Sequence, residues 1–139
     1  MLEQIKDILL VEDDEIDVMS VKRAVKELKI TNRLIIQSNG EEGLHYLNEN
    51  TTHLPGIILL DINMPRMNGI ELLKALKDHP KFKQIPVIML TTSKEESDKI
   101  AAFSLGIAGY MIKPVDYQKF VEIIKTIMHY WTLSDKPIL

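Results

Sequence analysis

The sequence predicts an α/β fold, a doubly wound five-stranded parallel sheet with helices on both faces. Short apolar runs alternate with segments of helical periodicity along the whole chain. Three of these runs are continuously apolar, which is typical of strands covered on both faces. Strands that alternate with helices favour a parallel sheet, because each helix carries the chain back across the sheet.

The expected strands follow from these apolar runs. The runs ILLV at 8–11 and IILL at 57–60 are the most apolar and should lie centrally. The strand order 2-1-3-4-5 makes them neighbours and places the switch point of the sheet between them. The five expected strands are 8–11, 34–36, 57–60, 87–90 and 110–112.

The expected helices lie between the strands, and three of them carry an apolar stripe at helical spacing. Asn39-Gly40 and Asn68-Gly69 precede helical stretches, and Pro86 opens the fourth strand. The last helix should run to about Trp131. The three stripes are Val18, Val21, Val25 and Leu28; Ile70, Leu73 and Leu76; and Phe120, Ile124, Ile127 and Trp131.

Length and composition bound the function. With 139 residues, the chain is expected to form a single domain over 1–139, with a core from about 6 to 131 and no output domain. The formal charge of -3 and the lack of a Lys/Arg-rich block give no reason to expect nucleic-acid binding. There is no cysteine, and no apolar run is long enough to span a membrane. No signal-peptide pattern opens the chain, so a cytoplasmic location is expected.

Polar side chains follow four of the expected strands. Because the carboxyl ends of parallel strands share one edge, where ligands bind in such folds, residues far apart in sequence should meet there. The edge therefore predicts a site with acids from strands one and three, hydroxyls from strand four and an ammonium from strand five. The residues are Glu12, Asp13 and Asp14; Asp61 and Asn63; Thr91, Thr92 and Ser93; and Lys113.

The chemistry of this cluster points to phosphoryl transfer. Acids brought together repel one another, and a hard cation with oxygen ligands relieves that repulsion. Mg²⁺ suits a half-open site that retains waters. Asp61 is the natural nucleophile, since carboxylates form acyl phosphates, while Lys113 and Thr91 are suited to the phosphoryl oxygens.

Each residue alone also has an ordinary structural explanation. Asp13 or Asp14 is suited to cap the next helix, and Asp61 to cap a turn. A single Thr91 is usually a strand-end hydroxyl, and a single Lys113 a solvated cation. Their joint occurrence at one edge favours the site.

Four segments, in this order and spacing, are highly specific in combination. They are VEDD at 11–14, LLDINMPRMNG at 59–69, PVIMLTTS at 86–93 and GYMIKP at 109–114. Over nearly its full length the chain resembles the receiver domain of two-component response regulators, which has a flavodoxin-like fold.

The resemblance implies that Asp61 accepts phosphate from a sensor histidine kinase, and that Mg²⁺ is bound by Asp13 and Asp61 directly. Glu12 would act through water, and the backbone carbonyl of Asn63 would be a further ligand. Thr91 and Lys113 would contact the phosphoryl oxygens, and Tyr110 would be the switch aromatic. It also implies a cis peptide before Pro114, which would aim Lys113 into the site.

Some features depart from the common family pattern or narrow it. Glu12 stands where Asp is frequent, and Thr92 stands where a smaller residue is common, which leaves the phosphate lifetime open. The segment 48–56 and the ending HYWTL at 129–133 resemble single-domain receivers paired with bacterial phytochrome kinases.

Two other classes of protein remain as alternatives. A phosphatase of the haloacid dehalogenase type needs an acid two residues after its nucleophile, and Asn63 cannot protonate a leaving group. A phosphorylation-independent interaction module usually lacks an acid or the lysine, and this chain keeps them all. Neither the histidines nor the Asn39–Gly43 stretch matches a metal or nucleotide motif.

Output is expected through protein contact. Phosphorylation would pull Thr91 inward and let Tyr110 turn in, which alters the surface of the fourth helix, fifth strand and fifth helix. A downstream protein or a second copy of the chain, forming a homodimer, would bind there. Apolar candidates for this surface, unless they belong to the core, are Ile100, Phe103, Tyr110, Met128 and Trp131.

Overall fold

The structure is a computed structural model of the chain, and it describes residues 6–134. Strands and helices alternate as the sequence predicts, with one additional short 3₁₀ helix before the fourth strand. The elements in chain order are β1 (Ile8–Val11), α1 (Glu15–Glu27), β2 (Leu34–Gln37), α2 (Gly40–Glu49), β3 (Ile57–Leu60), α3 (Gly69–Lys77), η1 (Phe82–Gln84), β4 (Val87–Thr91), α4 (Glu96–Ser104), β5 (Gly109–Ile112) and α5 (Tyr117–Leu133).

The five strands form one parallel sheet in the order β2-β1-β3-β4-β5, which confirms the predicted fold class and topology. Strands β1 and β3 pair in register, with Ile8 beside Ile57 and Val11 beside Leu60. Both strands end at the same level, so the residues that follow them, Glu12 and Asp61, emerge side by side at the carboxyl edge of the sheet.

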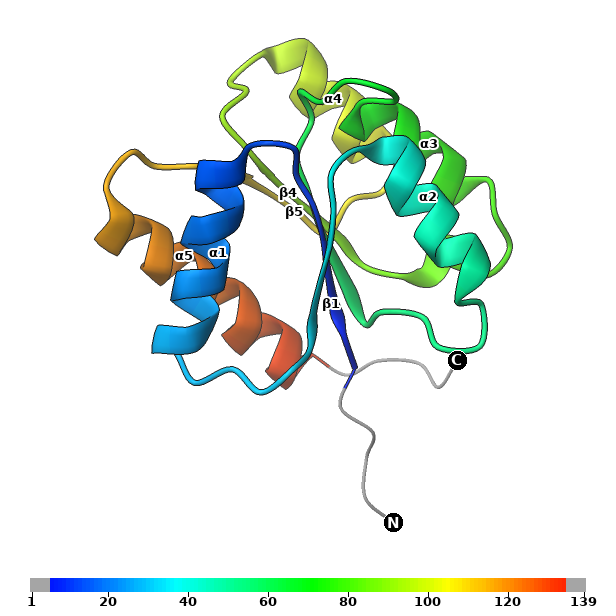
Figure 1. Ribbon diagram of the computed structural model, residues 1–139. Helices are drawn as coiled ribbons and strands as arrows, with labels where there is room; N and C mark the ends of the chain where they lie inside the picture. Colours follow the sequence, from blue (N-terminus) through cyan, green and yellow to red (C-terminus); the bar gives the residue numbers. More distant parts are fainter. Residues whose placement is uncertain (1–5, 135–139) are drawn as a thin grey trace.

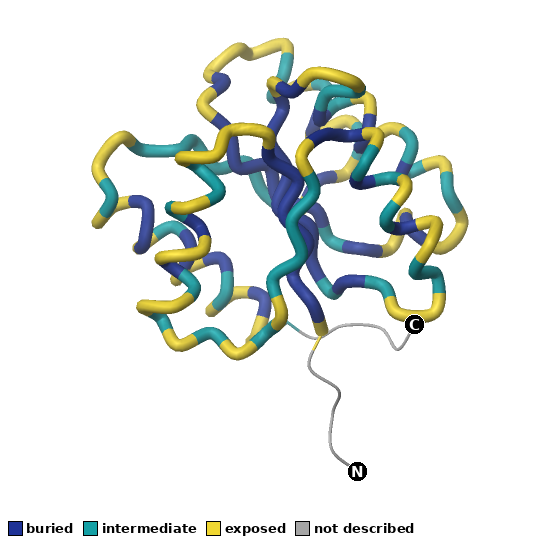
Figure 2. The backbone as a smooth tube through the Cα atoms, in the orientation of Figure 1, coloured by how far each residue is buried: buried dark blue, intermediate teal, exposed yellow. Residues whose placement is uncertain are grey.

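The apolar strands are buried because both faces of the sheet are covered. Helices α1 and α5 cover one face, and α2, α3 and α4 cover the other (Figure 1). Side chains alternate between the two layers: Leu9 and Val11 pack toward α2 and α3, whereas Ile8 and Leu10 pack toward α1 and α5. The central strands β1, β3 and β4 therefore form the buried centre of the molecule and support the residues at its edge, whereas the outer strands β2 and β5 are half-buried (Figure 2).

Polar caps fix where the helices near the carboxyl edge begin. The carboxylate of Asp14 accepts hydrogen bonds from the N–H groups of Ile16 and Asp17 and caps α1. Asn39 caps α2, and Asn68 forms a capping box with Glu71 at the start of α3. These side chains satisfy N–H groups that have no partner within the helix. Of the two acids expected as possible caps, Asp14 fills that role and Asp13 stays exposed.

Three details differ from the expectations. No cis peptide bond occurs among residues 6–134, so the expected cis bond before Pro114 is wrong for this structure. Helix α5 ends at Leu133 rather than near Trp131. Trp131 itself is 7% exposed and packs in the core between the sheet and α5, so it does not belong to the outer surface.

Candidate functional site

Three acids meet at the carboxyl edge, at the switch point between β1 and β3. One carboxylate oxygen from each of Glu12, Asp13 and Asp61 lies within 4.8 Å of the others. Glu12 and Asp61 are buried, and Asp13 is exposed. Like charges this close raise each other's cost of ionisation. The cluster is therefore suited to a cation.

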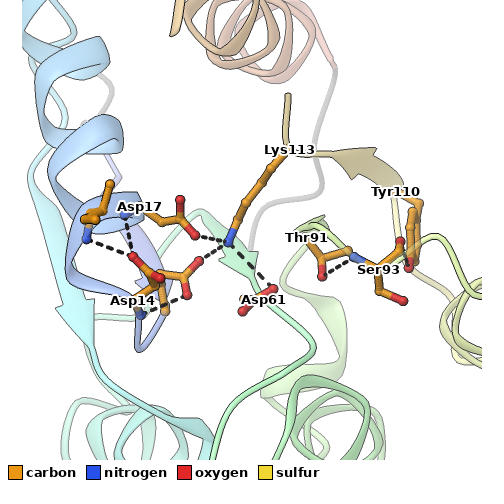
Figure 3. Close-up of polar contacts among 9 residues, drawn as sticks. Asp14, Asp17, Asp61, Thr91, Ser93, Tyr110 and Lys113 are labelled. Atoms are coloured by element: carbon orange, nitrogen blue, oxygen red, sulfur yellow. Dashed lines mark hydrogen bonds and ion pairs between the residues drawn. The ribbon is translucent and has the colours of Figure 1, made fainter. Parts of the chain in front are cut away.

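Lys113, which follows β5, brings its ammonium into this cluster (Figure 3). Its Nζ donates a very short hydrogen bond to Glu12, lies 2.8 Å from an Oδ of Asp17 and lies 3.7 Å from an Oδ of Asp61. The lysine side chain is only 6% exposed. A buried ammonium persists only where it is paired, and here three carboxylates surround it.

The register of β5 directs Lys113 into the site without a cis peptide bond. The N–H of Lys113 donates to the carbonyl of Thr91 at 2.8 Å, so the pairing of β4 and β5 continues past the end of β5. From that position the four-carbon side chain reaches Glu12, which lies 101 residues earlier. Backbone pairing and side-chain length together account for the placement.

Burial and charge shift the protonation of the paired groups. Burial raises the pKa of Glu12 to about 7; the hydrogen bond from Lys113 opposes this rise, and the charge of Asp61 adds to it. Burial by itself would lower the pKa of Lys113, but the hydrogen bonds to Asp17 and Glu12 and the charge of Asp61 raise that pKa. The ammonium is therefore charged, and Glu12 is the acid whose ionisation is costly without a further cation.

Thr91 is the last residue of β4, and in Figure 3 its hydroxyl group lies on the side of Asp61 away from the ammonium of Lys113. Thr91 is fully buried, and its Oγ1 accepts a hydrogen bond from the N–H of Ser93 at 3.2 Å. The carbonyl of Ser93 accepts from the hydroxyl of Tyr110 at 2.9 Å. The hydroxyl of Ser93 donates to Asp98 on α4 at 2.5 Å. Ser93 thus links the predicted switch residues Thr91 and Tyr110 to each other and to α4.

A groove of about 620 Å³ opens over the cluster. Asp13, Asp61 and Lys113 line it, together with the exposed residues Asn63 and Thr92. The groove gives solvent and small ligands a path to the acids.

The loop between β3 and α3, which carries Asn63, is held in an unusual conformation. Arg66 and Met67 have positive φ angles of 50° and 76°, a region that side chains with a Cβ rarely adopt. Their carbonyls accept hydrogen bonds from the first N–H groups of α2, on Glu41 and Gly40. Arg66 also pairs with the carboxylate of Glu41 at 2.9 Å. The start of α2 therefore holds this loop beside the acids.

Asp17 is a site residue that the sequence analysis did not identify. It lies in the first turn of α1, and its carboxylate, 32% exposed, contacts the ammonium of Lys113. It lies three residues after Asp14, the N-cap of α1, where an acid is ordinary in a sequence and gives no specific signal of a site. The other predicted residues meet at this edge, with Thr91 beneath the surface and Tyr110 farther out.

The donor set fits a hard divalent cation. The three acids offer oxygen ligands, and the open groove leaves room for water, which matches the preference of Mg²⁺ and Mn²⁺. Among residues 6–134, no other group of three or more acidic or histidine side chains is close enough to share an ion. No helix among those residues has the length and apolar character needed to cross a membrane.

The chain is similar to known proteins along most of its length. The family model of the response regulator receiver domain matches residues 8–125. The response regulator Rcp1 of Synechocystis sp. is 35% identical over 130 residues, which cover 91% of this chain and 88% of that protein.

Two solved structures share the fold along nearly the whole chain. The phosphorylated cyanobacterial phytochrome response regulator RcpA has a TM-score of 0.89 and 29% identity, covering 97% of this chain and 100% of that one. The Mn²⁺-bound form of Rcp1 has a TM-score of 0.86 and 33% identity, covering 96% and 99%. The chain therefore belongs to the receiver-domain family of the response regulators of two-component signalling.

Proposed function

We propose that this protein is a stand-alone response regulator that accepts a phosphoryl group on Asp61 from the phosphohistidine of a sensor histidine kinase. One observation carries the proposal. Asp61 is one of three acids whose oxygens lie within 4.8 Å of one another, and the ammonium of Lys113 lies 3.7 Å from it. This arrangement supports the proposal, because phosphoryl transfer to a carboxylate needs a cation and a fixed positive charge close to the attacking oxygen.

The residues have separate roles in the transfer. A carboxylate oxygen of Asp61 attacks phosphorus, and the bond from phosphorus to the imidazole nitrogen of the kinase breaks, with its electron pair left on that nitrogen. Lys113 donates to a phosphoryl oxygen. The hydroxyl of Thr91, which now accepts from the N–H of Ser93, would turn away from that N–H and donate its O–H to another phosphoryl oxygen.

Mg²⁺ is the cation that we propose for the site. Asp13 and Asp61 would bind it directly, Glu12 through water, and Asn63 through its backbone carbonyl. When bound, the cation supplies positive charge that offsets the charge of the acids and of the transferred group. The Mn²⁺-bound form of Rcp1 supports a divalent cation in this class of protein.

Signalling is proposed to run through Ser93. If the hydroxyl of Thr91 turns toward the phosphoryl group, the N–H of Ser93 loses its acceptor, and Ser93 also holds Tyr110 and Asp98. A shift there would move the β4–α4 loop and the surface formed by α4, β5 and α5. Ile100 and Phe103 on α4 are 63% and 58% exposed, and they give this surface its apolar character. We propose that a downstream protein or a second copy of the chain binds there.

The setting of the protein is proposed from its relatives. The family match over 8–125 and the extent of the match to Rcp1 support a single receiver domain over 1–139, which we propose acts in the cytoplasm. The formal charge of -3 gives no reason to propose that it binds nucleic acid. RcpA is a phytochrome response regulator, which supports a phytochrome-type histidine kinase as the phosphate source. The protein would catalyse only its own phosphorylation and slow dephosphorylation.

The decisive experiment is incubation with a small phosphodonor and Mg²⁺, followed by mass spectrometry of the intact protein. We expect one phosphoryl group per chain and none in the Asp61→Asn variant. Asp116→Asn is the matched control, because Asp116 caps α5 outside the acid cluster. A native protein that gains no phosphoryl group would leave only the phosphorylation-independent interaction module. Release of many equivalents of phosphate per chain would instead indicate a phosphatase.

A further inference from the structure

The ammonium of Lys113 has three N–H donors, and three carboxylates surround it. Two of these carboxylates belong to the acid cluster proposed to hold the cation: Glu12, which accepts a hydrogen bond from Nζ, and Asp61, which lies 3.7 Å away as an ion pair. The third, Asp17, lies 2.8 Å from Nζ and is not among the acids close enough to share that ion. Asp17 is thus the acceptor whose charge is directed to the lysine rather than to the cation site (Figure 3).

The local structure of α1 fixes the position of this carboxylate. The N–H of Asp17 donates to the capping carboxylate of Asp14 at 3.1 Å, which fixes the backbone of the first turn of α1 at Asp17. Asp17 approaches Lys113 from the α1 side, whereas Asp61 lies on the β3 side of the ammonium (Figure 3). The bond to Asp17 therefore helps to keep Nζ where it lies, 3.7 Å from an Oδ of Asp61.

The charges in the site explain why Lys113 needs an acceptor outside the acid cluster. A divalent cation bound by Glu12, Asp13 and Asp61 would compete with Lys113 for the carboxylates of Glu12 and Asp61, and it would also repel the ammonium. The lysine side chain is long and flexible, and its stem by itself does not fix Nζ. Asp17 remains as an acceptor that the cation does not take.

We infer that Asp17 is a positioning residue that holds the ammonium of Lys113 against Asp61 while a divalent cation occupies the acid cluster. The inference rests on the function proposed above, since it assigns Asp17 a part in the phosphorylation of Asp61. Asp17 acts through Lys113 and does not itself touch the phosphoryl group.

The test combines phosphorylation rates with a direct view of the lysine. Asp17→Ala is compared with Glu15→Ala, which removes an exposed acid from the same first turn of α1 but has no contact with Lys113. With saturating Mg²⁺ and a small phosphodonor, we expect Asp17→Ala to slow phosphorylation about fivefold to tenfold and Glu15→Ala to change it less than about twofold.

A double-mutant cycle separates positioning from a general effect of charge. In a Lys113→Ala background, Asp17→Ala should change the rate no further, because the group that it positions is gone. An equal slowing by Asp17→Ala in both backgrounds would overturn the inference.

Nitrogen NMR of the lysine ammonium gives a readout that does not depend on phosphorylation. The Lys113 resonance, assigned with Lys113→Arg, should be visible in the native protein with Mg²⁺, since bonded N–H groups exchange slowly, and should broaden or vanish in Asp17→Ala. An unchanged resonance would refute the inference even if Asp61 is phosphorylated normally. The opposite result is also informative. If the native protein is not phosphorylated but the Lys113 resonance is lost in Asp17→Ala, the contact between Asp17 and Lys113 is supported and the proposed function is refuted.

Discussion

A Cβ atom added to Gly69 would lie 2.2 Å from the carbonyl oxygen of Asp61 and 2.8 Å from the Cα of Ile62. Gly69 begins α3, and its N–H donates to the carbonyl of Ile62 at 2.9 Å. The start of this helix therefore packs directly on the backbone of the proposed phosphoacceptor. Only a residue without a side chain permits that approach, because backbone atoms cannot rotate away.

We predict that Gly69→Ala lowers stability by about 2 kcal/mol and slows the phosphorylation of Asp61, because the backbone at Asp61 has to move. Chemical denaturation and phosphorylation with a small donor measure the two effects. Gly109→Ala is the control, since a Cβ there would meet Ile88 at an ordinary 3.9 Å. Equal behaviour of the two variants would contradict the prediction.

The pH dependence of stability should report the burial of Glu12. Its pKa rises from 4.5 to about 7 on folding, so between these values the folded protein binds more protons than the unfolded chain. Stability therefore falls as the pH rises through this window, by about 1 to 3 kcal/mol relative to Glu12→Gln, which does not titrate. Denaturation of both proteins in chelator from pH 4.5 to 8 measures the difference, and a constant difference across that range would refute the prediction.

Removal of Lys113 should make the stability of the folded protein depend on a bound divalent cation. Lys113→Ala leaves the buried carboxylates of Glu12 and Asp61 without their ammonium, so we expect a loss of about 3 kcal/mol in chelator. Added Mg²⁺ should recover much of that loss, because a ligand that binds only the folded state stabilises it. Thermal denaturation with and without Mg²⁺ measures both quantities. Lys99→Ala, which breaks an exposed pair with Glu96, should show neither effect.

Thr91→Ala should uncouple the phosphorylated site from the β4–α4 loop. The change removes the acceptor of the Ser93 N–H, so the NMR shift of that amide should no longer respond to phosphorylation, although Asp61 still accepts the group. Tyr110→Phe keeps Thr91 and removes only the hydrogen bond to the carbonyl of Ser93, which should cost about 1 kcal/mol. The Ser93 amide of that variant should still respond. A response that persists in Thr91→Ala would exclude this route.

Much of the fold was predictable because the hydrophobic pattern determines it. Continuous apolar runs at 8–11 and 57–60 have one low-energy placement, in the centre of a covered parallel sheet. That placement brings the residues after each strand to one edge, so the meeting of Glu12, Asp61 and Lys113 followed from topology. The roles of these residues in phosphoryl transfer stay predictions.

Features that depend on side-chain reach and packing were not predictable in the same way. Asp17 was missed because a first-turn acid of a helix is ordinary in sequence, and only the direction of Lys113 gives it a partner. Trp131 was both a member of the apolar stripe of the last helix and a candidate for the outer surface, and the structure places it in the core with Ile127. The expected cis peptide before Pro114 came from the family alone, with no physical requirement in this chain.

The contact between Lys113 and Glu12 joins residues 101 positions apart. Until β5 has paired with β4, the acids that follow β1 and β3 have no ammonium beside them. The acids and the lysine of the site are therefore brought together only late in the synthesis of the chain. A nascent or truncated polypeptide that ends before β5 would display the carboxylates and lack their counter-charge. Phosphoryl transfer at its full rate would then require that β5 has paired with β4, and a kinase would phosphorylate chains with a complete sheet faster than incomplete ones.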